Sequence, residues 1–253
     1  MPMKFNKVAN PNPDFVEQQR PARENNIDWL ARAIAALGGD APLEQSYILL
    51  LGANDTLSWR LRTGQSHLRF DLLPSYWSSA VLLKLHQRSL KESTVIHVPL
   101  FQPADGLFAT ERNGVVETPL SEFGNTRKWK NIALITFPVP QETVLSQLLL
   151  FEKGRSYIDA LEHVLRWLAF AWGVARTPNP IHDGVGLPSA CMLETLFASA
   201  GLDITPGLES RASSPEAIWA TALYWYEHYT TNRLPTPKGR FFTPHDYEIK
   251  DGR

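Results

Sequence analysis

Cysteine is nearly absent from this chain of 253 residues, which has a single thiol at Cys191. One cysteine excludes an internal disulfide framework and a cysteine-rich zinc site, and it fits a reducing compartment. The N-terminal residues lack an apolar signal core, and no apolar run approaches the length of a transmembrane helix. We therefore expect a cytoplasmic protein with no membrane segment.

A surplus of one sign of charge is also lacking. Lys and Arg together number 25 and Asp and Glu number 26, so the formal net charge is −1. Proteins that bind nucleic acids or anionic membranes usually carry a strongly basic surface. Neither kind of partner is expected here.

Motifs that fix a reaction are missing too. The sequence has no GxGxxG after a predicted strand, no GxxxxGK[ST] and no GxSxG, and its seven His show no HExxH or paired-His spacing. These gaps argue against a nucleotide cofactor, an α/β-hydrolase elbow and a metal centre. We predict that the protein uses no cofactor and no metal.

Apolar patterns in the N-terminal half predict mainly β-strands. The alternating or continuous apolar runs that predict strands are residues 47–51, 57–62, 68–72, 95–101 and 132–137. Asn113 followed by Gly114 predicts a hairpin within residues 108–119. Two helices interrupt this pattern, one that Asn26 can cap and that Gly38 and Gly39 close, and one over residues 75–90.

The C-terminal half has the pattern of helices. Apolar spacing predicts helices over residues 141–152, 155–173, from Pro188 to about Gly201, and 214–230. The fold class is therefore α+β, an antiparallel-rich sheet from the N-terminal half packed by helices of the C-terminal half. We divide the chain into a polar N-terminal arm (1–25), a single α+β domain (26–234) and an extended C-terminal tail (235–253).

The helix that begins at Pro188 carries the candidate functional residue. Ser189 lies in its first turn, on the same face as the apolar stripe of Leu193, Leu196 and Phe197, whereas Cys191 falls nearly opposite. The free N–H groups and positive dipole end at a helix N-terminus can activate a nucleophile and stabilise an oxyanion. Ser189 can equally serve as a cap or fill space near the helix start.

This helix resembles the signature helix of the NlpC/P60 papain-like hydrolases. In that family a catalytic Cys begins the helix and an Ala-Gly pair comes about a dozen residues later; with Ala200 and Gly201 as that pair, the Cys position falls on Ser189. The serine departs from the family pattern and implies a serine variant, an inactive relative or an engineered replacement. The Ser-Pro-Glu at 214–216 is similar to the segment after this helix in the permuted branch, where the catalytic His precedes the nucleophile.

The resemblance implies a general base before residue 189, on a strand. His67, which comes directly after Gly64-Gln65-Ser66, is the candidate base, and His97 on another predicted strand is the candidate orienting group or the base itself. The residue pattern alone also allows His67 to be an ordinary exposed residue. His163 is expected on the polar side of its helix, while His182 and Asp183 lie in a loop that must pass the start of the Ser189 helix.

Two functions are consistent with these patterns. The first is a papain-like amide or ester hydrolase or acyl-transfer fold, with or without retained activity, with Ser189, His67 and His97 as its site. The second is a non-catalytic interaction component of a larger assembly. Its partner would be a protein that binds the N-terminal arm, the C-terminal tail or the aromatic helix 214–230.

Overall fold

A single seven-stranded sheet organises the computed structural model, which describes residues 12–39, 41–87, 89–102 and 107–244. The sheet order is β1-β7-β6-β2-β3-β4-β5, and all neighbours are antiparallel except β1 and β7. The strands are β1 (Phe15–Glu17), β2 (Ser46–Ala53), β3 (Ser79–Lys84), β4 (Thr94–His97), β5 (Val116–Pro119), β6 (Trp129–Phe137) and β7 (Lys238–Phe242). The predicted α+β class with an antiparallel-rich sheet is confirmed.

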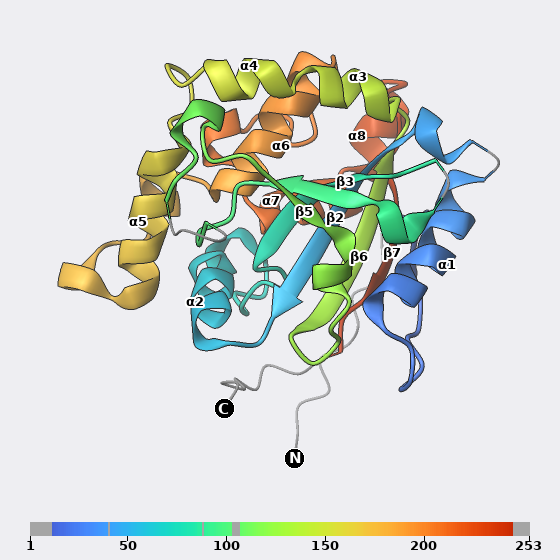
Figure 1. Ribbon diagram of the computed structural model, residues 1–253, viewed down its shortest axis with the longest axis horizontal. Helices are drawn as coiled ribbons and strands as arrows, with labels where there is room; N and C mark the ends of the chain where they lie inside the picture. The colour runs from blue at the N-terminus through green and yellow to red at the C-terminus, as the bar shows by residue number, and fades with distance from the viewer. Residues whose placement is uncertain (1–11, 40, 88, 103–106, 245–253) are drawn as a thin grey trace.

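Helices cover both faces of this sheet (Figure 1). The helices are α1 (Asn26–Gly38), α2 (Thr56–Gly64), α3 (Gln141–Ser146), α4 (Leu148–Lys153), α5 (Ala160–Trp172), α6 (Pro188–Ser199), α7 (Pro215–Tyr224) and α8 (Tyr226–Thr231). Helix α1 packs on one face, where Trp29, Leu30 and Ala33 are fully buried. The other face is covered by α2 to α7, so one helix from the N-terminal half joins those of the C-terminal half.

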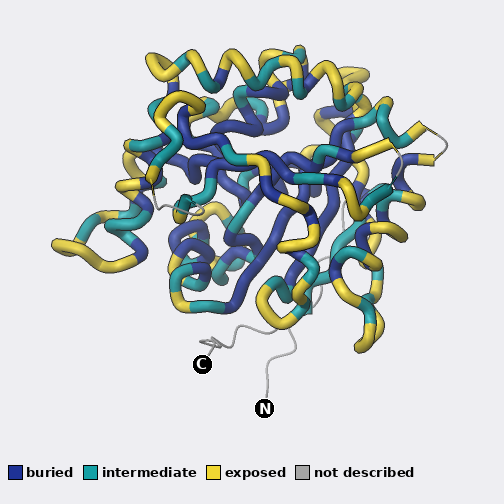
Figure 2. Tube along the Cα trace, viewed as in Figure 1, coloured by how far each residue is buried: buried dark blue, intermediate teal, exposed yellow. Residues whose placement is uncertain are grey.

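The central strands hold the core. Every residue of β2 is buried, and Figure 2 shows the middle of the sheet as the darkest part of the chain trace. Alternate residues serve the two faces, as the strand period of two requires: Ile48 and Leu50 join the cluster under α6, and Leu49 and Leu51 join the cluster under α1.

The two segments that the sequence assigned to an arm and a tail contribute strands. Phe15 pairs with Gly239, and β7 fits between β1 and β6. The phenyl ring of Phe15 also contacts the indole of Trp219 with 5.6 Å between ring centroids. Residues 15–17 and 238–242 are therefore parts of the sheet; residues 1–11 and 245–253 lie outside the described part of the chain.

Four local predictions were wrong. Residues 57–62 form α2 and not a strand, because Asp55 caps a helix there and Leu57 and Leu61 share one helical face. Residues 68–72 form no strand, and residues 75–90 contain the buried strand β3 instead of a helix.

The fourth wrong prediction is the hairpin within residues 108–119. Asn113 and Gly114 do adopt the positive φ values of 50° and 77° that such a turn needs. However, the segment before them forms a 3-10 turn, and β5 after them pairs with β4. The helices predicted over 141–152 and 214–230 are each broken in two, the second at Trp225.

No helix in the described ranges is both long enough and apolar enough to cross a bilayer.

Candidate functional site

A cavity of about 1060 Å³ opens at the end of the sheet where β4 parts from β3. The two strands stay in register only as far as the pair of Leu82 and Ile96, so within the described residues β3 has no β4 partner over residues 79–81. The N-terminal turns of α2 and α6 and the segment 122–130 complete the cavity wall. Both Ser189 and His97 line it.

Ser189 lies in the first turn of α6, as predicted. Pro188 takes the first helical position, and the Ser189 side chain is only 7% exposed. The Ser189 Oγ donates a hydrogen bond to the backbone carbonyl of Ala80 in β3, at 2.5 Å. This hydrogen bond ties α6 to the sheet. It also directs the hydroxyl proton of Ser189 at a peptide carbonyl, which cannot serve as a general base.

His97 faces away from Ser189. Its neighbours Ile96 and Val98 pack in the cluster under α6, whereas the His97 ring contacts Phe123, which belongs to the cluster on the other face of the sheet. The Nε2 of His97 lies 3.0 Å from Thr118 Oγ1. Burial lowers the pKa of the imidazole to about 4, so His97 is neutral at physiological pH.

His67 does not line this cavity. It lies in the 3-10 turn Ser66–Leu68 and not on the predicted strand. Its ring meets that of His182, with 4.7 Å between centroids, and both burial and the proximity of His182 lower its pKa. The structure thus brings Ser189 and His97 to one cavity on opposite faces of the sheet, and places His67 with His182 elsewhere.

A thiol–imidazole pair that the sequence did not suggest lies inside the helical layer. Cys191 Sγ is 3.7 Å from His163 Nδ1, and both side chains are buried, although the helical spacing suggested a Cys191 facing away from the core and a His163 on a polar face. Two carbonyls hold the pair: the thiol contacts the Arg211 carbonyl at 3.2 Å, and His163 Nδ1 lies 2.9 Å from the Gly186 carbonyl. Because a carbonyl oxygen only accepts hydrogen bonds, the Cys191 thiol and His163 Nδ1 are both the donors in these contacts and both carry a proton. Burial also raises the pKa of the thiol.

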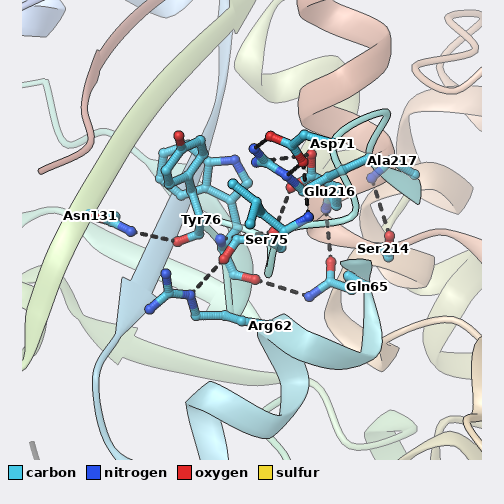
Figure 3. A network of polar contacts seen from close by, with 12 residues as sticks. Arg62, Gln65, Asp71, Ser75, Tyr76, Asn131, Ser214, Glu216 and Ala217 are labelled. Carbon is cyan, nitrogen blue, oxygen red and sulfur yellow. Dashed lines mark hydrogen bonds and ion pairs between the residues drawn. The ribbon is translucent and has the colours of Figure 1, made fainter. Parts of the chain in front are cut away.

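A buried charge network lies beside α7 and connects residues 65–75 with Glu216 (Figure 3). The guanidinium of Arg69 forms two hydrogen bonds, of 2.8 and 2.6 Å, with the Asp71 carboxylate, and lies 3.8 Å from Glu216. Ser75 Oγ donates to Glu216 Oε2 at 2.5 Å, and Gln65 Oε1 accepts from the Glu216 backbone N–H. Burial raises the pKa of the Glu216 carboxyl to about 7, although Arg69 opposes this shift.

Two apolar residues of the same segment point outward. Phe70 and Leu72 are 69% and 70% exposed, while the side chains of Arg69 and Asp71 on either side of Phe70 are held inward. Phe70 meets Tyr224 at the end of α7 edge to face, with 6.4 Å between centroids. We call the four exposed side chains Phe70, Leu72, Tyr224 and Trp225 the aromatic patch.

Among the described residues, no three His, Cys, Asp or Glu side chains gather in a way that could hold a metal ion.

Comparison with known proteins gives no relative: no family model matches the chain, and no curated protein and no solved structure matches it.

Proposed function

We propose that this chain is a non-catalytic interaction protein that docks a protein partner on the aromatic patch. The observation that carries the proposal is the alternation at residues 69–72. Two large apolar side chains face the solvent there, and the two charged side chains, Arg69 and Asp71, are fixed beneath them.

This arrangement is costly for the folded state alone. Buried ion pairs rarely add net stability, because desolvation of the charges offsets their attraction. Leu72 also has a left-handed backbone with φ of 55°, a conformation that costs a residue with a Cβ about 1–2 kcal/mol. Exposed apolar side chains that are held rigid bind with less loss of entropy, so the network beneath Phe70 and Leu72 favours recognition.

The patch also refines the predicted docking regions. Of the aromatic helix 214–230, Ile218, Trp219 and Tyr229 are buried in the protein. Tyr224 and Trp225 stay partly exposed, and Tyr224 contacts Phe70. Residues 15–17 of the predicted arm and residues 238–242 of the predicted tail form strands of the sheet, so they are no longer candidate docking segments. We infer a cytoplasmic location from the single cysteine, as part of the same proposal.

A papain-like acyl-transfer activity is the second candidate. It is favoured by Ser189, which lies at the start of a helix on the wall of a large cavity. It is disfavoured by the hydrogen bond from Ser189 to Ala80 and by the position of His97 on the other face of the sheet.

Site-specific photo-crosslinking tests the docking proposal. A benzoylphenylalanine in place of Phe70 is expected to give one dominant protein adduct in the native host, and the additional substitution Leu72→Glu is expected to abolish it. The matched control carries the same probe in place of Tyr157, which is 86% exposed and lies outside the patch. No adduct at position 70, or the same adduct at both positions, would refute the proposal.

A further inference from the structure

The cavity beside α6 is lined by a polar side chain that has no partner among the described residues. Asn54 comes directly after the last residue of β2 and is only 9% exposed, yet within the described residues its carboxamide makes no hydrogen bond. The Asn54 carboxamide atoms are not among the fully buried polar atoms that lack a partner, so they are accessible from the cavity and can accept or donate a hydrogen bond to a ligand there. Asn54 therefore points to a ligand.

Backbone donors lie on the same wall. No side chain caps α6, and the N–H groups of Ser189 and Ala190 have no acceptor in the described part of the chain. By contrast, Asp55 caps α2 and Ser214 caps α7. Uncapped amides at the positive end of a helix favour an anion.

A short chain of contacts relates Asn54 to these amides. The backbone N–H of Ala53, next to Asn54, donates to Ser78 Oγ at 3.1 Å. Two residues after Ser78, the Ala80 carbonyl accepts from Ser189 Oγ. Asn54 and the first turn of α6 thus lie on the wall of the same cavity, next to the start of β3.

The charges around the cavity favour a negative ligand. Arg127, Lys128 and Lys130 contribute to its wall, against the carboxylates of Asp55 and Glu122. Three cations against two carboxylates leave the cavity wall with a formal charge of +1.

Most of the other wall is apolar. The large apolar side chains that line the cavity include Leu57, Leu61, Leu100, Phe101 and Phe123. A bare inorganic anion would leave these side chains in contact with water, whereas a ligand with an apolar body would cover them.

We propose that this cavity binds an amphipathic carboxylate, with its carboxylate at the Asn54 amide and the Ser189 and Ala190 N–H groups and its apolar body against Leu57, Phe101 and Phe123. Two sources share this chemistry, a fatty acid and the C-terminus of an apolar peptide. The site is separate from the aromatic patch, so the inference does not depend on the proposed docking function.

Titration calorimetry on the full chain tests the site with matched pairs of probes. One pair is octanoate and octanamide, and the other is N-acetyl-Leu-Phe as the free acid and as its C-terminal amide. In the pair that fits the cavity, the acid is expected to bind at least about tenfold more tightly than the amide, because the charge-assisted hydrogen bonds are lost with the carboxylate. The pair that binds identifies the source as a fatty acid or a peptide end.

Variants assign the binding to the named residues. Asn54→Asp is expected to weaken the acid by about tenfold or more, because it places a second negative charge beside the carboxylate. Lys128→Gln, on the exposed rim, is expected to weaken it less, and Lys153→Gln, an exposed cation away from the cavity, is expected to leave it unchanged.

Several results would overturn the proposal. They are no binding of either acid, equal binding of acid and amide, or acid binding that both Asn54→Asp and Lys128→Gln leave unchanged. If Asn54→Asp does not fold, the Lys128→Gln variant still tests the site, because Lys128 is exposed and its substitution disturbs no buried packing.

Discussion

The hydroxyl of Ser189 donates to the carbonyl oxygen of Ala80 across 2.5 Å, and the two residues lie 109 positions apart in the chain. This bond fixes the first turn of α6 to the start of β3. It also bears on the choice between two roles for Ser189, because a nucleophile needs its proton on a base and not on a peptide carbonyl. We therefore interpret Ser189 as a structural residue.

Substitutions in the aromatic patch are expected to leave the stability of the fold almost unchanged, whereas substitutions in the charge network beneath it are expected to lower it. Phe70→Ser should change the free energy of unfolding by no more than about 0.5 kcal/mol, because the side chain is exposed. Arg69→Met should destabilise the fold by about 3 kcal/mol or more, because Glu216 and Asp71 then lose their shared cation. Chemical denaturation of the two variants measures both values, and similar losses in both would contradict the assignment.

The Glu216 carboxyl should make stability depend on pH. Its pKa is about 7 in the folded protein against 4.5 in the unfolded chain, so the folded state retains the proton to higher pH. The contribution of Glu216 is thus fully present below pH 4.5 and is lost as the pH rises toward 7, by about 3 kcal/mol in total.

Glu216→Gln provides the comparison, because the amide mimics the protonated acid and still accepts from Ser75. The variant and the wild type should be similar in free energy of unfolding near pH 4.5, and the variant should be the more stable at about pH 8. Parallel pH profiles would show that Glu216 is not the titrating group.

Cys191 should be inert in the native protein. It is completely buried, its thiol contacts the carbonyls of Arg211 and Ser213, and burial raises its pKa. A chromogenic disulfide reagent should label it only as fast as the protein unfolds, and at once in denaturant. Labelling that outpaces global unfolding would mean that the thiol is reached by a local opening.

Gly186 should be intolerant of a side chain. A Cβ built there would lie 2.0 Å from the carbonyl oxygen of Ser213, and the Gly186 backbone also accepts hydrogen bonds from His163 and Trp167. We expect Gly186→Ala to destabilise the fold by about 1–3 kcal/mol or more. A thermal melt measures this, and an unchanged melting temperature would show that the loop before α6 can shift freely.

The sequence predicted the features that local patterns encode. The apolar run at 47–51 lies in β2, and the polar-to-apolar change at Asn26 lies at the start of α1, where the neighbouring Asn25 makes the cap. The alternation at 57–62 was misleading because Leu57 and Leu61 satisfy a helical spacing equally well over so short a stretch. Asp55, which caps α2, was the sequence signal that distinguishes a helix from a strand here.

The other features depend on contacts between distant residues. Lys238–Phe242 becomes β7 only because β1 and β6 provide an edge on each side, which no local pattern in a Pro-flanked segment reveals. The candidate site shows the same limit: the helical position of Ser189 was predictable, but its bond to Ala80 was not. The contact between Ser75 and Glu216, separated by 141 positions, likewise has no local signature.

The most direct test of the non-catalytic interpretation is covalent labelling of Ser189 by a fluorophosphonate probe, detected by mass spectrometry on the intact chain and on its peptides. Because the Ser189 proton is held by the Ala80 carbonyl and His97 lies on the other face of the sheet, we predict no adduct at Ser189. A stoichiometric adduct at Ser189 that is lost in His97→Ala would contradict this interpretation and establish a serine hydrolase.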